Sequence, residues 1–126
     1  MFKKFFVCFG IAVLSINTAI AACDIANYQY QIETNNSSIG TFTINQDCLS
    51  GKLIFPADGI NADVIRITIG SKGRYGSREI SFLRNDTYTQ LYTGWLSSDN
   101  KVISGNLVNL NKKMPSLEKF PFFATR

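Results

Sequence analysis

Hydrophobic and polar residues alternate along most of the chain after residue 27, and clusters of turn-forming residues interrupt this alternation. A period of two residues is typical of a β-strand with one buried face, whereas no segment has the sustained 3.6-residue period of an amphipathic helix. The clearest case is Ile65, Ile67 and Ile69, which alternate with Arg66 and Thr68. We expect these isoleucines to face a core and the two polar side chains to face water.

The whole pattern predicts about eight short strands separated by clusters of Asn, Asp, Ser, Gly and Pro. Their expected ranges are 28–33, 40–44, 48–55, 65–69, 79–84, 87–96, 101–110 and 120–125. No connection is long enough for a crossover helix, so the strands should pair antiparallel. We therefore expect an all-β antiparallel fold, a closed or partly closed barrel, with a β-sandwich as the alternative. Glycines inside the predicted strands indicate bends or bulges of a closing sheet, at positions 40, 51, 94 and 105.

The first residues differ from this pattern. Two lysines precede an apolar run over residues 5–16, and residues 19–21, Ala-Ile-Ala, have the small residues of a cleavage site. The run of about 12 residues is shorter than the roughly 20 that cross a bilayer. We expect residues 1–21 to be a cleaved signal peptide, with an uncleaved anchor as the alternative. Residues 22–126 should then form a single domain in the periplasm or extracellular space.

The number and distribution of charged residues argue against a nucleic-acid partner. The chain has a net charge of +4, but two lysines belong to the expected signal peptide, so 11 basic and 9 acidic residues remain. The basic residues are scattered, and only Lys72, Arg74 and Arg78 form a local cluster, which we interpret as a solvated loop. A weakly basic domain without a basic stripe is not typical of nucleic-acid binding, so we expect no nucleic-acid partner.

The cysteines allow two interpretations. Cys8 would leave with the signal peptide, so Cys23 and Cys48 remain, and an even pair outside the cytoplasm usually forms a disulfide. Alternatively, residues 20–23, Ile-Ala-Ala-Cys, fit a bacterial lipobox. Cys23 would then be acylated, and the protein would be an envelope lipoprotein with a structural role. The polar residues before this segment, and the thiol of Cys48 that acylation would leave unpaired, favour the disulfide. A membrane is an expected partner only under the alternative.

Catalytic and metal motifs are missing from the sequence. The chain has no histidine, which removes Ser-His-Asp and Cys-His catalysis, and two cysteines cannot complete a common zinc site. The acidic residues fall mostly in predicted turns, and no spacing selects a catalytic carboxylate pair. We therefore expect a protein that is not an enzyme and that has no catalytic residues, metal or cofactor.

Aromatic residues on one predicted hairpin are the best candidates for a binding site. Tyr88, Tyr92 and Trp95 combine flat apolar faces with polar tips, which suit ligands and partner proteins, and Gln90 lies between them. By strict alternation the first three share one face, and Trp95 shares the other with Leu91, so one of the two sets must be core. We predict a binding module for another protein, such as an enzyme that it inhibits, or for a small ligand in the barrel mouth.

The C-terminal residues resemble a strand pattern of avidins, which are secreted eight-stranded barrels. Avidins have a glycine in a penultimate strand and then Trp-x-Ala-Thr-Arg. Here Gly105 is followed by residues 122–126, Phe-Phe-Ala-Thr-Arg, with Phe122 at the tryptophan position. The resemblance covers about a sixth of the chain, and the early Gly-x-Trp strand of avidins is missing. It implies a barrel and does not extend to biotin binding. Residues 23–25, Cys-Asp-Ile, with a second cysteine are also similar to small periplasmic metalloprotease inhibitors, another class of secreted barrel.

Overall fold

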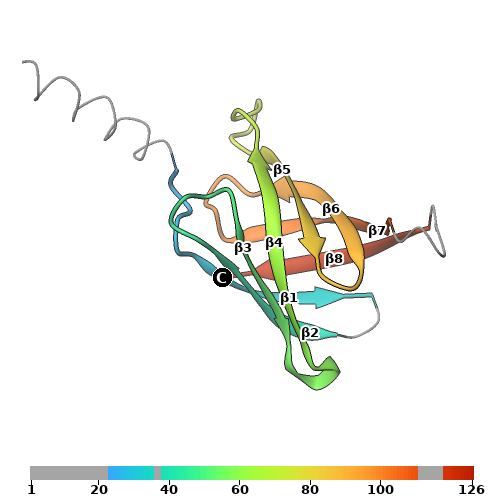
Figure 1. Ribbon diagram of the computed structural model, residues 1–126. Coiled ribbons are helices and arrows are strands. Elements are labelled where there is room, and N and C mark those ends of the chain that lie inside the picture. Colours follow the sequence, from blue (N-terminus) through green and yellow to red (C-terminus); the bar gives the residue numbers. More distant parts are fainter. Residues whose placement is uncertain (1–22, 36–37, 111–117) are drawn as a thin grey trace, which may run out of the picture.

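The computed structural model describes residues 23–35, 38–110 and 118–126, and these form one closed barrel (Figure 1). Each strand pairs antiparallel with the next, and the last strand pairs with the first. The predicted all-β antiparallel barrel is therefore confirmed. The described strands are β1 (Gln29–Thr34), β2 (Ile39–Ile44), β3 (Gly51–Phe55), β4 (Ile60–Ile69), β5 (Arg78–Asn85), β6 (Thr89–Leu96), β7 (Val102–Asn109) and β8 (Lys119–Thr125), and a 3-10 turn covers Pro56–Asp58.

The N-terminal prediction concerns residues that the structure does not describe. The expected signal peptide, residues 1–21, lies outside the described ranges. Within those ranges, no helix is long and apolar enough to cross a membrane.

Side chains fill the middle of the barrel. Aromatic rings pack in sequence from Tyr30 through Phe42, Phe82 and Tyr92 to Phe122, each almost fully buried. Phe82 lies at the centre of this column, with its ring centroid 4.5 Å from that of Phe42 and 4.8 Å from that of Tyr92. The interior of an eight-stranded barrel is just wide enough for its own side chains or for one small ligand, and here side chains occupy it. In the described part of the chain, hollows lie at the ends of the barrel and on its outer wall.

Four glycines within the strands lie where neighbouring strands come very close together. Gly94 in β6 pairs with Gly105 in β7. A Cβ atom on Gly105 would overlap the Thr93 carbonyl oxygen, and one on Gly94 would overlap the Ser104 carbonyl oxygen. Added Cβ atoms at the other two predicted positions, 40 and 51, would also overlap backbone oxygens of neighbouring strands. Only glycine, which has no side chain, fits at these positions, because the strands approach each other closely there.

A β-bulge in β4 overturns part of the predicted alternation. The register between β4 and β5 shifts between Ile65 and Thr68, and Arg66 has a left-handed φ of 54°. Because a bulge inserts an extra residue, the side chains before and after it change faces. Val64 and Ile67 are buried inside the barrel, whereas Ile65 lies on the outer wall, half-buried. The prediction is wrong for Ile65 and confirmed for Ile67 and for Ile69, which is partly buried against the core.

The same substitution at these two isoleucines should have different effects. Ile67→Val removes a methylene group from the core and should lower the free energy of unfolding by about 0.5–1.5 kcal/mol. Ile65→Val removes it from the outer wall and should cost less than about 0.5 kcal/mol. Urea denaturation of both variants measures the difference. Equal losses would contradict the bulge.

The third strand begins later than predicted, at Gly51 instead of Cys48. The Asp47 carboxylate accepts hydrogen bonds from the backbone N–H groups of Leu49 and Ser50, at 2.9 and 3.2 Å. Such side-chain bonds to the backbone favour a turn over an extended strand. Cys48 is in the left-handed region, with a φ of 56°, so the backbone is not extended at this residue.

Candidate functional site

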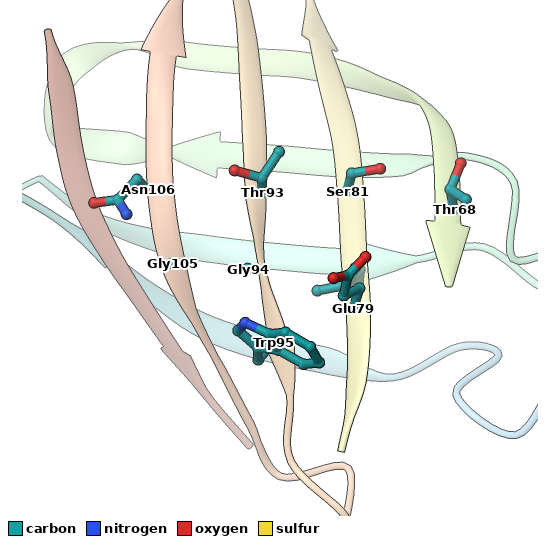
Figure 2. Close-up of a pocket in the computed structure, with 9 residues that line it drawn as sticks. Thr68, Glu79, Ser81, Thr93, Gly94, Trp95, Gly105 and Asn106 are labelled. Atoms are coloured by element: carbon teal, nitrogen blue, oxygen red, sulfur yellow. The ribbon is translucent and has the colours of Figure 1, made fainter. Parts of the chain in front are cut away.

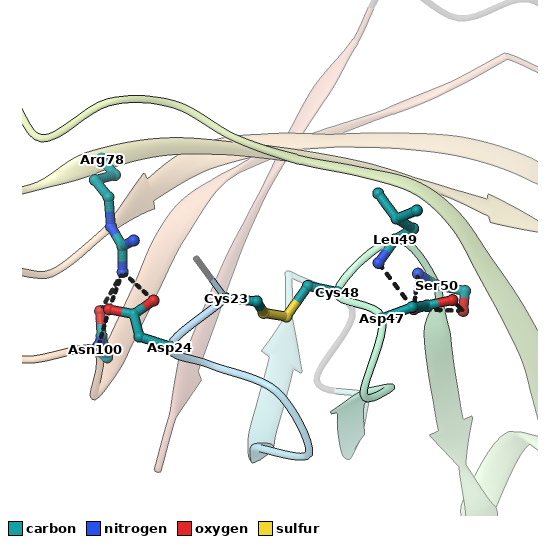
Figure 3. The surroundings of a disulfide bond; sticks show 8 residues. All are labelled: Cys23, Asp24, Asp47, Cys48, Leu49, Ser50, Arg78 and Asn100. Atoms are coloured by element: carbon teal, nitrogen blue, oxygen red, sulfur yellow. Dashed lines mark hydrogen bonds and ion pairs between the residues drawn. A yellow bond between two sulfur atoms is a disulfide. The ribbon is translucent and has the colours of Figure 1, made fainter. Parts of the chain in front are cut away.

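The N-terminal segment covers one end of the barrel, and a disulfide holds it there. Cys23 and Cys48 are bonded, with their Cα atoms 6.3 Å apart (Figure 3). Ile25, which follows in the same segment, is fully buried against the core. The predicted disulfide is confirmed. Acylation of Cys23 would need the same sulfur atom, so the two modifications exclude each other.

Arg78 lies inside this covered end. Its Nη2 group donates to both carboxylate oxygens of Asp24, at 3.1 and 3.2 Å, and to Asn100 Oδ1 at 2.6 Å (Figure 3). The interpretation of Lys72, Arg74 and Arg78 as one solvated loop is wrong for Arg78, which is only 9% exposed. The reason is that β5 begins at Arg78 and turns this side chain inward, whereas Lys72 and Arg74 lie exposed in the preceding loop.

Among the residues that the structure describes, the opposite end of the barrel is open and contains a cavity of about 490 Å³. Its apolar walls come from four side chains, those of Phe55, Ile60, Leu107 and Phe120. Polar groups converge on it from several strands and turns, including Ser38, Asp58, Arg84, Gln90 and Tyr92. The cavity therefore combines apolar surface with a small set of hydrogen-bonding groups.

Arg84 organises the polar side of this cavity. Its side chain is 6% exposed, and its Nε and Nη2 groups donate to the two carboxylate oxygens of Asp86 at 3.0 and 2.8 Å. Arg84 Nη1 donates to Gln90 Oε1 at 3.2 Å, and the Tyr92 hydroxyl donates to the same oxygen at 3.1 Å. Because both donors bind Oε1, the orientation of the Gln90 amide is fixed and its N–H groups point away from Arg84.

The four predicted binding residues are divided between two places. Gln90 and Tyr92 lie together at the open end, where burial raises the pKa of Tyr92 to about 12. Tyr88 lies in the turn beside them, with its ring 5.8 Å from the Arg84 guanidinium carbon. Trp95 is on the outer wall, because it follows the opposite face of β6.

Sequence patterning does not identify Arg84 as a residue of the site, although the alternation along its strand indicates that its side chain faces inward. The alternation that places Ile80 and Phe82 inside the barrel also places Arg78 and Arg84 on the same inward face. Charged residues are rarely buried unless they are paired, so alternation alone gives no reason to place an arginine inside. Their partners, Asp24 and Asp86, belong to predicted turns, and a turn residue can serve as the counter-ion at the rim of a barrel.

The side chains around the open cavity are apolar or able to form hydrogen bonds. In the described part of the chain, no cluster of three or more His, Cys, Asp and Glu residues could hold a metal ion. The described residues around the open cavity offer hydrogen-bond donors, one paired arginine and apolar surface. Comparison with protein-family models, with curated proteins and with solved structures gave no match.

Four carboxyl groups have a lowered pKa in the folded protein, and two of them, Asp24 and Asp86, pair with buried arginines. Burial alone would raise the pKa of Asp86, but hydrogen bonds from Arg84 and from the Tyr88 N–H outweigh it and lower the pKa below 3.8. The pKa of Asp24 is lowered in the same way by Asn100 and Arg78, against the effect of burial. A carboxyl group with a lower pKa in the folded state contributes stability above its unfolded pKa. This contribution disappears as the pH falls through the folded pKa.

We therefore expect the free energy of unfolding to decline once the pH falls below about 4. Asp86→Asn should be less stable than the wild type at neutral pH and should lose less stability on acidification. Urea denaturation at stepped pH values measures both. If both proteins lose the same free energy of unfolding on acidification, the Arg84–Asp86 pair does not cause the pH dependence.

Proposed function

We propose that the protein is a non-enzymatic binding protein of the periplasm or extracellular space, and that it takes a small molecule at the open end of the barrel. The observation that carries this proposal is the cavity of about 490 Å³ with its oriented Gln90 amide. Ligand sites typically measure about 300–1,000 Å³ and combine apolar walls with a few precisely placed polar groups. This cavity has both properties.

The polar groups indicate the class of ligand. Gln90 offers N–H donors, so the ligand should carry a hydrogen-bond acceptor. Asp86 already balances the charge of Arg84, and Asp58 adds another carboxylate at the cavity. A ligand carboxylate would therefore meet little net positive charge. A neutral carbonyl or hydroxyl group on an apolar body, which would contact Phe55 and Phe120, fits this arrangement better.

The same geometry supports a small ligand over the protein partner that the sequence favoured first. Trp95 lies on the outer wall, apart from Gln90 and Tyr92, so the predicted aromatic residues do not form one continuous contact surface. Export is supported by the disulfide, since structural disulfides persist mainly in oxidising compartments. The alternative of a lipoprotein acylated at Cys23 would require this disulfide to be absent.

Small probes test the cavity directly. Acetophenone, cyclohexanol and cyclohexanecarboxylate share an apolar ring and differ in the polar group. In NMR titrations, the ketone and the alcohol should shift the side-chain amide signals of Gln90 more than the carboxylate does. Gln90→Leu should weaken ketone binding about tenfold, and Gln31→Leu, the same change on the outside of β1, should leave it unchanged. If no probe shifts signals of the cavity residues, the proposal is wrong.

A further inference from the structure

A second hollow lies on the outer wall of the barrel, over strands β4 to β7 (Figure 2). Its volume is about 360 Å³. Trp95 borders it, with 51% of its surface exposed, and Gly94 and Gly105 add backbone without side chains. The hollow is separate from the open cavity, and no residue lines both.

The strand register gathers polar side chains beside Trp95. Thr68 pairs with Ser81, Ser81 with Thr93, and Thr93 with Asn106, so these four residues form one row across four strands. Directly opposed side chains lie about 4.5–5.5 Å apart at Cβ. Figure 2 shows this row running beside Trp95 and its cross-strand neighbour Glu79. The hollow therefore presents one aromatic face and a line of hydroxyl, amide and carboxylate groups.

These polar groups take little part in holding the fold together. Within the described part of the chain, the side-chain hydrogen bond in this row is a long one, 3.4 Å from Thr68 Oγ1 to the Arg66 carbonyl oxygen. Glu79 is the charged residue among those that line the hollow, and neither lysine nor arginine is among them. The site is therefore unsuited to an acidic ligand, and its hydroxyl and amide groups match a ligand that has many hydroxyl groups.

We infer that this hollow binds a neutral carbohydrate, with one sugar ring stacked on the indole of Trp95. The negative face of an aromatic ring attracts the polarised C–H groups on the flat side of a pyranose. Sugar hydroxyls both donate and accept, so they match the Thr93 hydroxyl and the Asn106 amide, while the Glu79 carboxylate accepts from a further hydroxyl.

The barrel itself argues against a peptide in this position. Recognition of an extended peptide by a sheet usually needs an unpaired edge strand, and this closed barrel has each described strand paired on both sides. Protein interfaces are also centred on clusters of apolar or aromatic anchors. Here a single aromatic side chain is surrounded by five polar ones, Thr68, Glu79, Ser81, Thr93 and Asn106.

Trp95 provides its own signal for the experiment, because it is the one tryptophan in the chain. Titration with cellohexaose, maltohexaose and chitohexaose should shift the tryptophan emission with at least one of them and protect it from acrylamide quenching. Asn106→Ala should weaken that binding about tenfold. For Trp95→Ala, isothermal titration calorimetry should show an affinity for the sugar that is about tenfold lower or weaker still. Thermal melts of each variant establish that the barrel is folded.

Two control variants test whether sugar binding belongs to this hollow. Phe123→Ala removes another exposed aromatic ring from the outer wall, and it should leave sugar binding unchanged. Gln90→Leu alters the open cavity and should also leave sugar binding unchanged, so failure of the cavity proposal would not affect this result. The inference is overturned if none of the three sugars changes the fluorescence, or if the acidic polymer polygalacturonate binds more tightly than they do.

Discussion

Phe82→Ala should lower the free energy of unfolding by about 3–5 kcal/mol, because it removes the centre of the aromatic column. The Phe82 ring is 1% exposed and stacks between Phe42 and Tyr92, and the edge of Phe122 approaches it with centroids 6.2 Å apart. These neighbours come from three different strands, so they cannot all move into the vacated space without distorting the barrel. Urea denaturation followed by far-ultraviolet circular dichroism measures the loss.

Phe123 provides the matched control for this experiment. It lies on β8 next to Phe122, but it faces outward and is 48% exposed. Phe123→Ala should therefore change stability by less than about 1 kcal/mol. Phe82→Leu keeps most of the buried apolar volume and should lie between the two alanine variants. If Phe82→Ala and Phe123→Ala are equally stable, the assignment of the barrel interior is wrong.

Replacing Cys23 and Cys48 together by serine should cost about 2–4 kcal/mol. The disulfide joins residues 25 positions apart and so restricts the unfolded chain. In the folded protein it also holds the N-terminal segment, with the buried Ile25, over the end of the barrel. The double variant should keep the ligand sites at the open end and on the outer wall, because neither includes a cysteine. Denaturation curves with and without a reductant provide the comparison.

The intact mass of protein isolated from cells tests the state of Cys23 at the same time. We expect a chain that begins at Ala22 or Cys23, carries no acyl group and has no thiol available for labelling after denaturation. A retained Met1 would exclude cleavage of the signal peptide. A diacylglyceryl group would favour the lipoprotein, and in that case Cys23→Ser alone would release the protein from the membrane.

The sequence predicted the fold class because alternation is a local property of each strand. Phe42, Phe82, Ile103 and Leu107, which lie on three different strands, all face inward. The bulge at Arg66 could not be found in this way. Nothing in the local pattern marks it, since neither glycine nor asparagine occupies the left-handed position. The bulge depends on how β4 pairs with β5 and on the hydrogen bond from the Ile67 N–H to the Leu49 carbonyl oxygen.

The candidate sites were less accessible to prediction, because they depend on contacts between distant residues. Alternation correctly separated Trp95 from Gln90 and Tyr92, but it could not tell which set faced inward. The row from Thr68 to Asn106 exists only after three strand registers are known. Arg78 meets a carboxylate 54 positions away, at Asp24, and no sequence spacing indicates such a pair.

The pairing of β1 with β8 determines when this protein is able to fold. Gln31 pairs with Thr125, so closure joins nearly the first and last described residues, and the Arg126 guanidinium carbon lies 3.9 Å from the Tyr28 ring centroid. Contacts over such separations are formed late and slow the folding reaction. Before β8 is available, β1 and β7 each have an unpaired edge, and open edges favour aggregation. A barrel of this topology therefore cannot close until the residues of β8 are available to pair with β1 and β7.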